Sequence, residues 1–150
     1  MKVAELEGPL LDLWVARAEG EQLSPDFPER DKNNGRYWLK SDRFYSVKLC
    51  PEYSRRWDVG GPIIERDQIF LNPPSTIHTT GGPDPGWKTY DHWRATVSAT
   101  TRTLPPKNEI QKAMNLGGVG RGAGKTALLA AMRAKVASHF GDEVPDEGAQ

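Results

Sequence analysis

The sequence predicts an α+β domain in which two main helices pack on a small antiparallel sheet of three to five strands. Apolar residues recur at helical spacing over residues 9–19 and again after Thr126. Apolar and polar residues alternate instead over residues 43–49 and 87–101. A period near 3.6 is typical of helices and a period of two of strands, so both kinds of element are expected. The length of 150 residues suggests one domain.

The first helix is predicted over residues 9–19. Pro9 suits the first helical position, because its missing N–H would have no partner there. Gly20 is a suitable C-terminal stop. The residues expected to share the apolar face are Leu10, Leu13, Trp14 and Ala18. We interpret Trp14 as a core anchor.

A polar segment and a short strand are expected next. Residues 21–36 are broken by prolines and by an Asn-Gly pair, so they predict a flexible loop insertion. The alternation over residues 43–49 predicts a half-buried strand that ends at Cys50. A lone cysteine beside an apolar strand is expected to be a small core residue and not a nucleophile. It also leaves no internal disulfide to form.

Two further strands, over residues 63–71 and 87–101, are predicted to pair as an antiparallel hairpin. The proline- and glycine-rich residues 72–86 would form its long tip. Residues 103–123 are poor in apolar side chains and end in a glycine run, which predicts a second flexible loop insertion. A short helix around residues 107–115 is expected within it.

The last helix carries the clearest apolar stripe. Thr126 suits the N-cap position, because its side-chain oxygen can accept from unpaired amides. Gly141 would end the helix, and the acidic residues 142–150 are expected to form a frayed tail. The stripe consists of Leu129, Met132, Val136 and Phe140.

Charge and hydropathy narrow the range of partners. Twenty basic residues balance twenty acidic ones, so there is no global field to attract nucleic acid, and a nucleic-acid partner is not expected. No apolar run approaches the roughly 18 residues of a membrane helix, and the first residues lack the apolar core of a signal peptide. We therefore expect an intracellular protein without a membrane partner.

The glycine-rich residues 118–126, GVGRGAGKT, resemble a phosphate-binding P-loop but do not fit one. That loop requires glycine, four residues and then Gly-Lys-Thr, and Val119 stands where the first glycine belongs. A weaker alternative remains open: a glycine-rich helix N-terminus can bind an anion, with Lys125, Thr126 and Arg121 nearby.

The residues predict neither a metal site nor a cofactor. His78, His92 and His139 are far apart in sequence, and no paired metal-ligand motif is present. Asp91 and His92 are adjacent, but neighbours on a strand would point to opposite faces. A carboxylate dyad among the acidic residues stays open, although no pair is forced together. We predict that the protein is not an enzyme.

The candidate ligand site lies at residues 53–66, YSRRWDVGGPIIER. Aromatic rings and guanidinium groups can stack on a flat ring and pair with phosphate, and adjacent glycines permit close backbone approach. Core tryptophans and solvated arginines are the alternative interpretation. Trp87 and Tyr90 would lie across the hairpin. The predicted binding residues are Tyr53, Arg55, Arg56, Trp57, Gly60, Gly61, Trp93, Lys125 and Thr126.

Three segments together resemble the NinX-like proteins of tailed phages and prophages. They are LDLWVARAEG (11–20), residues 53–66, and TALLAAMRAKVASHFGDEVP (126–145), and they cover about 45 of the 150 residues. The family often has Gly-Pro-Thr-Pro before the last helix, where this chain has Gly-Lys-Thr-Ala, which supports Thr126 as a cap. The resemblance implies a phage accessory protein acting in the cytoplasm of a host bacterium, and it implies no activity.

The first functional hypothesis is a binding protein that sequesters a small nucleotide-type signalling molecule and so counters host defence. Its pocket would be formed at the sheet and residues 53–61, and we expect a homo-oligomer. The alternative is a protein-interaction module that binds and inhibits a host protein. A third hypothesis is a hydrolase acting on a nucleotide.

Overall fold

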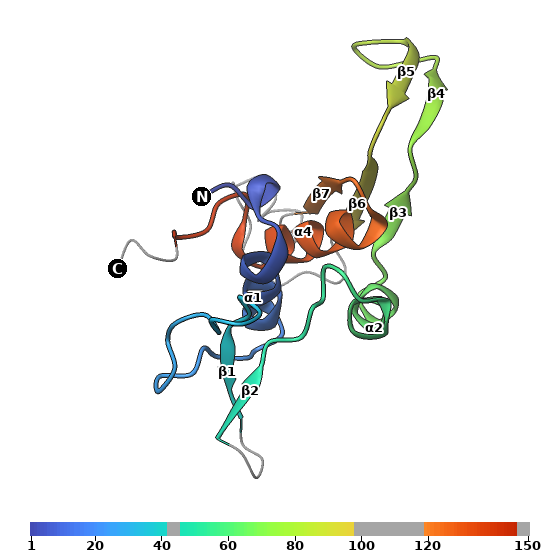
Figure 1. Cartoon of the computed structure of the whole chain (residues 1–150). Helices are drawn as coiled ribbons and strands as arrows, with labels where there is room; N and C mark the ends of the chain where they lie inside the picture. The colour runs from blue at the N-terminus through green and yellow to red at the C-terminus, as the bar shows by residue number, and fades with distance from the viewer. Residues whose placement is uncertain (42–45, 98–118, 147–150) are drawn as a thin grey trace.

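The computed structural model describes residues 1–41, 46–97 and 119–146, and it confirms the α+β class with small antiparallel sheets. Two central helices lie between hairpins that project on opposite sides (Figure 1). The elements are η1 (Val3–Glu5), α1 (Gly8–Ala18), β1 (Trp38–Lys40), β2 (Val47–Leu49), α2 (Trp57–Arg66), β3 (Phe70–Asn72), β4 (Ser75–Thr79), β5 (Gly86–Tyr90), β6 (Trp93–Val97), β7 (Gly120–Gly124) and α4 (Ala127–Phe140).

The α1 helix confirms the first predicted helix and is buried on two sides. Leu11, Trp14 and Val15 pack in the main core with α4 and the three-stranded sheet β3–β6–β7. Leu13 and Ala16 instead contact the β1–β2 hairpin, in a second cluster that includes Cys50. Trp14 is 6% exposed and packs edge-on against Phe140, which supports its role as an anchor. The stripe predicted from sequence is therefore too narrow, because the hairpin covers another side of the helix.

The predicted strand over residues 63–71 is wrong for most of its length. Residues 57–66 form α2, Ile63 points into the core, and only residues 70–72 form a strand. The error arose at Gly60-Gly61-Pro62, which usually breaks regular structure. The helix continues through Pro62. It ends at Arg66, and Gln68 follows in the left-handed region with a φ of 51°.

The predicted hairpin is confirmed at its base, where β3 pairs antiparallel with β6 and Leu71 lies opposite Ala95. Its long tip is not a loop, because β4 pairs with β5 in a separate two-stranded ribbon. The single strand predicted over 87–101 is accordingly two strands with a turn between them, and residues 98–101 lie outside the described residues. Pro73 and Pro74 separate the two ladders, since proline has no N–H to donate.

The glycine-rich end of the predicted insertion is an ordered strand. Residues 120–124 form β7, which pairs antiparallel with β6, so the loop expected over 103–123 is wrong at its C-terminal end. The helix expected around residues 107–115 lies outside the described residues. Of the strand predicted over 43–49, the described residues 47–49 form β2, which pairs with the unpredicted strand β1.

The α4 helix confirms the last predicted helix and its cap. The Thr126 hydroxyl accepts a hydrogen bond from the Leu129 amide at 3.1 Å, and Gly141 follows the last residue with a φ of 88°. Lys135 is 5% exposed and forms an ion pair with Asp67, which follows α2. Burial alone would raise the pKa of Asp67, but hydrogen bonds from Arg66 and Lys135 outweigh it and lower that pKa. This buried pair fixes α4 against α2.

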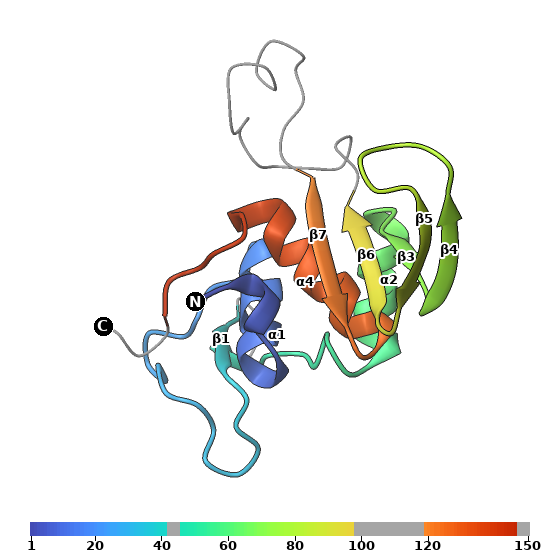
Figure 2. The same ribbon diagram turned by 90° about the horizontal axis from the view of Figure 1, so that it is seen from above.

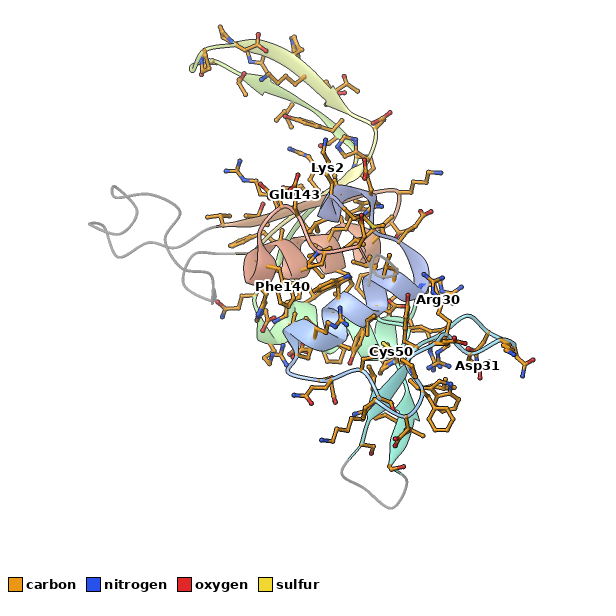
Figure 3. The ribbon with its side chains drawn as sticks, turned by 90° about the vertical axis from the view of Figure 1, so that its left-hand side faces the viewer. Lys2, Arg30, Asp31, Cys50, Phe140 and Glu143 are labelled. Atoms are coloured by element: carbon orange, nitrogen blue, oxygen red, sulfur yellow. The ribbon has the colours of Figure 1, made fainter. Side chains whose placement is uncertain are left out.

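The start of the acidic tail lies along the N-terminal segment instead of fraying. The Val3 amide donates to the carbonyl of Asp142 at 2.9 Å, and Val144 is 2% exposed. Lys2 and Glu143 form an isolated antiparallel bridge, and Figure 3 shows them side by side. The frayed tail expected from residue 142 onward therefore does not hold for residues 142–144.

Candidate functional site

The candidate site is built on the contact between β7 and α4. A Cβ atom at Gly120 would lie 2.3 Å from the Ala134 carbonyl oxygen, and one at Gly122 would lie 2.2 Å from the Ala130 carbonyl oxygen. Backbone atoms cannot rotate away, so side chains at these positions would force the helix off the strand. The glycines that suggested a phosphate loop therefore let α4 pack directly on the sheet, as Figure 2 shows from above.

Because Gly120 and Gly122 face α4, the residues that alternate with them on β7 lie on the opposite face of the sheet. Successive strand residues point to opposite faces, so Arg121 and Ala123 lie on the side away from α4. Their partners across the ladder are Thr96 and Arg94 of β6, and Arg94 also lies opposite Asn72 of β3. The outer face of the three-stranded sheet is therefore polar and carries two guanidinium groups.

A cleft of about 580 Å³ lies on this outer face and is called the sheet cleft below. Its walls come from the sheet, from the end of β5 and from η1. The residues that line it are Ala4, Asn72, Tyr90, His92, Arg94, Ala95, Thr96, Arg121, Gly122 and Ala123. Among these described residues there are two arginines and no carboxylate, so the cleft favours an anion.

Arg94 is the central cation of the sheet cleft. The carbon of its guanidinium group lies 3.6 Å from the centroid of the Tyr90 ring, a cation–π contact. Its Nε atom is buried and has no hydrogen-bond acceptor among the described residues. A buried donor without an acceptor is costly and uncommon in a folded protein. An oxygen atom supplied by a ligand would remove that cost after a small movement of the side chain.

The second arginine is placed to contact the same ligand. Arg94 and Arg121 are diagonal neighbours on adjacent strands, a relation that separates two residues by about 7–8 Å. Long side chains at that separation can reach two neighbouring anionic groups. Guanidinium groups bind phosphate oxygens through paired hydrogen bonds, and Thr96 and Asn72 add neutral hydrogen-bonding groups. The cleft therefore has the chemistry of a phosphate-ester or diphosphate site.

Asp91 and His92 form the turn between β5 and β6, where they contact each other. His92 Nδ1 lies 2.8 Å from Asp91 Oδ1, and this hydrogen bond lowers the pKa of Asp91. The expectation that their side chains point apart is wrong, because the two residues connect strands and are not in one. The contact lies at the edge of the sheet cleft, which His92 helps to line.

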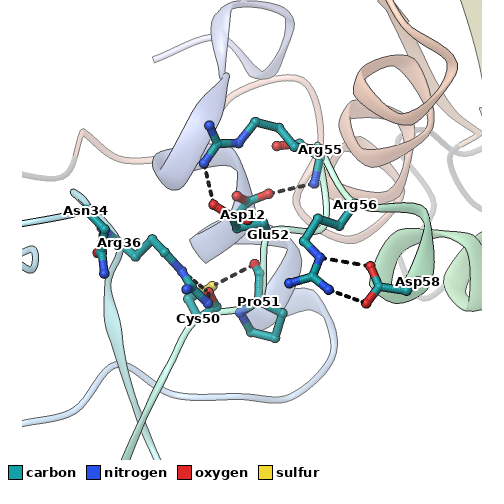
Figure 4. A network of polar contacts seen from close by, with 10 residues as sticks. Asp12, Asn34, Arg36, Cys50, Pro51, Glu52, Arg55, Arg56 and Asp58 are labelled. Atoms are coloured by element: carbon teal, nitrogen blue, oxygen red, sulfur yellow. Dashed lines mark hydrogen bonds and ion pairs between the residues drawn. The ribbon is translucent and has the colours of Figure 1, made fainter.

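The residues 53–61, called the 53–61 turn, lie elsewhere, at the start of α2. Arg55 forms an ion pair with Glu52, and Arg56 donates to both carboxylate oxygens of Asp58 at 3.0 and 2.7 Å (Figure 4). Trp57 is 56% exposed. Neighbouring carboxylates thus offset both of these positive charges, which weakens the attraction of the turn for an anion.

Only the first of the two glycines in the 53–61 turn is required by the packing of the fold. A Cβ atom at Gly60 would lie 2.4 Å from the Tyr53 carbonyl oxygen and 2.8 Å from the Leu128 side chain. The backbone at Gly60 therefore packs closely against other parts of this chain, and the glycine is not needed for contact with a ligand. At Gly61 a Cβ atom would only reach ordinary contact with Trp57, at 3.6 Å. Tyr53 is partly buried against the core, and burial raises its pKa.

The remaining predicted binding residues also have identifiable positions. Trp93 lies opposite Gly124 on the inner face of the sheet and packs against the core. Lys125 and Thr126 are exposed just before α4, and the Thr126 hydroxyl is used as the helix cap. The sheet cleft is lined by none of the nine residues predicted from sequence, although it includes Tyr90 and Arg121, which also stood out in the sequence.

Asp12 is a buried charge that no sequence pattern pointed to. It is 2% exposed in α1, and its Oδ1 accepts the Ser54 backbone N–H at 2.7 Å, which anchors the 53–61 turn to the helix. Burial raises the pKa of Asp12 to about 6, against the hydrogen bond from Ser54 and the charge of Arg55. Burial likewise raises the pKa of the Cys50 thiol to about 12, which agrees with a core role for that residue.

Metal-ligand clusters and membrane-spanning helices are both missing from the described part of the chain. In residues 1–41, 46–97 and 119–146, no three histidine, cysteine or acidic side chains gather closely enough to hold a metal ion. Within the same ranges, no helix has both the length and the apolar character needed to cross a bilayer.

A period-two pattern could have revealed the sheet cleft in advance. Arg94 and Thr96 alternate with the apolar residues of β6, and Arg121 alternates with the glycines of β7. The second pattern was hidden because glycine-rich sequence is usually interpreted as a loop. The pairing of the two strands is also a long-range contact, which no local pattern specifies.

The chain was compared with curated proteins and with models of protein families. No curated protein matches it. The family model described as "Bacteriophage P22, NinX" matches residues 2–139, which is nearly the whole chain and includes α1, the sheet and most of α4. The match confirms the resemblance seen in the three sequence segments. The chain therefore belongs to the NinX family of bacteriophage P22.

Proposed function

We propose that this phage accessory protein binds a small nucleotide-type signalling molecule in the sheet cleft without converting it, and thereby counteracts host antiviral defence from the bacterial cytoplasm. The observation that carries the proposal is the pairing of Arg94 and Arg121 in a cleft of about 580 Å³ that no described carboxylate lines. A volume of this size is within the range of small-molecule sites. Membership of the phage family supports the accessory role.

The ligand class follows from the groups that line the cleft. Two guanidinium groups on adjacent strands match two phosphate groups or one diphosphate. The stacked Tyr90–Arg94 pair offers a flat surface for a base, and Asn72 and Thr96 can bind hydroxyl groups. Cyclic dinucleotides and ADP-ribose-type molecules combine all of these features. The proposed site is therefore the sheet cleft and not the 53–61 turn, while the proposed class of ligand is the same as the one expected from the sequence.

Thermal unfolding against a panel of cyclic dinucleotides and ADP-ribose-type molecules tests the proposal. A ligand that binds only the folded state raises the melting temperature by mass action. We expect Arg121→Ala and Arg94→Gln each to weaken binding of the active compound by about tenfold or more, because each removes a charge-assisted hydrogen bond worth about 1.5–3 kcal/mol. Titration calorimetry measures the change.

Arg56→Ala provides the matched comparison, because it removes the same charge from the 53–61 turn. Loss of binding in Arg56→Ala, with normal binding in the two cleft variants, would assign the ligand to the turn instead. Chromatography of the released ligand checks the absence of catalysis. Recovery of a converted product would support the hydrolase hypothesis, and no response from any compound in the panel would count against sequestration.

A protein-interaction module is the second candidate, and the loop of residues 21–36 favours it. Phe27 is 52% exposed and its ring lies 6.0 Å from that of Trp38, beside a cavity of about 510 Å³. Exposed aromatic residues at a cavity are typical of protein contacts. On this hypothesis a pull-down from host lysate retains one stoichiometric protein, regardless of added nucleotide, and Phe27→Ala loses it. Retention by Phe27→Ala would contradict this assignment.

A further inference from the structure

The β4–β5 ribbon, called the hairpin arm below, projects from the body of the molecule (Figure 1). Its five cross-strand pairs run from Ser75 with Tyr90 to Thr79 with Gly86. Ile77 and Trp87 are exposed, the latter by 73%. A two-stranded ribbon without further cover is marginally stable in water. A partner that covers the arm would therefore stabilise it.

The free edge of β4 is the surface most open to such a partner. Within the described residues β4 pairs only with β5, and Figure 2 shows β4 at the rim of the molecule with no other described segment beyond it. No described strand uses the backbone N–H and C=O groups on that edge, so they can pair with another strand. Extended segments bind such edges by adding a strand to the sheet.

The side chains of β4 lack the features that normally keep edges apart. Natural edge strands are protected by lysine, by inward charges, by proline or by bulges. The five residues of β4, Ser-Thr-Ile-His-Thr, include no acidic, lysine, arginine or proline residue, and three of them are β-branched. The opposite edge differs, because Lys88 stands at the centre of β5. Of the two edges, only that of β4 is suited to pair with an identical strand.

We propose that the partner is a second copy of this chain, whose β4 pairs antiparallel with the first β4 about a two-fold axis at Ile77. In this register Ile77 lies opposite its own counterpart, and Thr76 lies opposite His78 of the other copy. The two isoleucine side chains cover each other, and the two arms form one four-stranded sheet. The equivalent pairing of β5 would place Lys88 against Lys88, which is unfavourable because like charges directly opposite repel.

The small size of the contact sets its expected strength. Stable interfaces bury about 800 Å² on each partner, whereas five residues of one strand edge bury less. The arm contact alone therefore predicts a weak dimer whose population rises with protein concentration. It also gives a location for the homo-oligomer expected from the sequence, and it does not depend on the ligand proposed for the sheet cleft.

Disulfide trapping tests the register. Directly opposite residues of an antiparallel pair have Cα atoms about 4.5–5.5 Å apart, within the range that a disulfide can bridge. Ile77→Cys is therefore expected to give a covalent dimer under mild oxidation. Thr76→Cys lies diagonal to its own counterpart, beyond about 7 Å, and is expected to remain monomeric. The native Cys50 is 2% exposed and contributes little background.

Light scattering over a concentration series provides the equilibrium measurement. The mean mass of the wild-type protein should rise toward twice the monomer mass, whereas Ile77→Lys should stay monomeric at every concentration because it places two charges at the axis. Circular dichroism confirms that the variant is folded. A wild-type mass that stays monomeric, equal trapping of the Thr76→Cys and Ile77→Cys variants, or preferential trapping of Lys88→Cys would each overturn the proposal.

Discussion

Replacement of Gly122 with alanine is expected to lower the free energy of unfolding by about 3 kcal/mol, the upper part of the usual range for overpacked sites. The added Cβ atom would lie 2.2 Å from the Ala130 carbonyl oxygen and 2.5 Å from the Ala134 amide nitrogen. Both atoms belong to the backbone of α4, so the helix as a whole must move. That movement would open the contact where Ala130 and Ala134 are fully buried.

Chemical denaturation measures this loss, and Gly61→Ala is the matched control. Gly61 lies inside α2, where its added Cβ atom would reach only ordinary contact with Trp57, at 3.6 Å. Alanine is the better helix former by about 1 kcal/mol, which offsets the crowding of its Cβ atom against Pro62, so Gly61→Ala should cost much less than Gly122→Ala. Equal stability of Gly122→Ala and the wild-type protein would contradict the direct packing of α4 on β7.

The second large effect concerns the dependence of stability on pH at Asp12. The pKa of Asp12 is raised from its ordinary value of 3.8 to about 6 in the folded protein. The folded state therefore binds the proton more tightly than the unfolded state does. The resulting stabilisation is fully present below the unfolded pKa and is lost as pH rises through about 6. A shift of this size corresponds to about 3 kcal/mol.

Comparison of the wild-type protein with Asp12→Asn isolates this effect, because asparagine does not titrate. We expect the stability of the wild-type protein relative to Asp12→Asn to fall by about 2.5 kcal/mol between about pH 4 and pH 7, as measured by denaturation at each pH. Subtracting the stability of Asp12→Asn from that of the wild-type protein at each pH removes the contribution of the other titrating groups, which both proteins share. Parallel stability curves for the two proteins would contradict a raised pKa at this position.

Asp12→Ala tests the hydrogen bond separately from the charge. It removes the acceptor of the Ser54 amide, and a buried donor left without a partner costs about 1–3 kcal/mol. This loss of stability, measured relative to Asp12→Asn, should appear both near pH 4 and near pH 7. Near neutral pH, Asp12→Asn should be at least as stable as the wild-type protein, because it keeps the acceptor and removes the charge. Asp12→Ala should be less stable than Asp12→Asn, because it also loses the acceptor. This difference separates the contribution of the hydrogen bond from the cost of the charge.

The candidate binding residues were predicted from their adjacency in sequence, which did not identify the residues of the sheet cleft. The 53–61 turn attracted attention because arginine, aromatic residues and paired glycines lie together in sequence. In the structure, Glu52 and Asp58 offset the charges of the two arginines, and a side chain at Gly60 would collide with the carbonyl of Tyr53. Arg94 and Arg121 are 27 positions apart by their numbers, and strand pairing makes them neighbours. A search by adjacency in sequence could not have joined them.

The sequence alone determined the two main helices, the N-cap at Thr126, the α+β class and the family, because these depend on local periodicity, on caps and on short characteristic segments. Only the tertiary structure decided that the glycines of β7 are packing positions, that residues 57–66 are helical and that the arginines share one face. The physical reason is that these outcomes depend on what lies opposite each residue. A glycine against the backbone of α4 and a glycine in a loop look the same in sequence, and only the contact between distant segments distinguishes them.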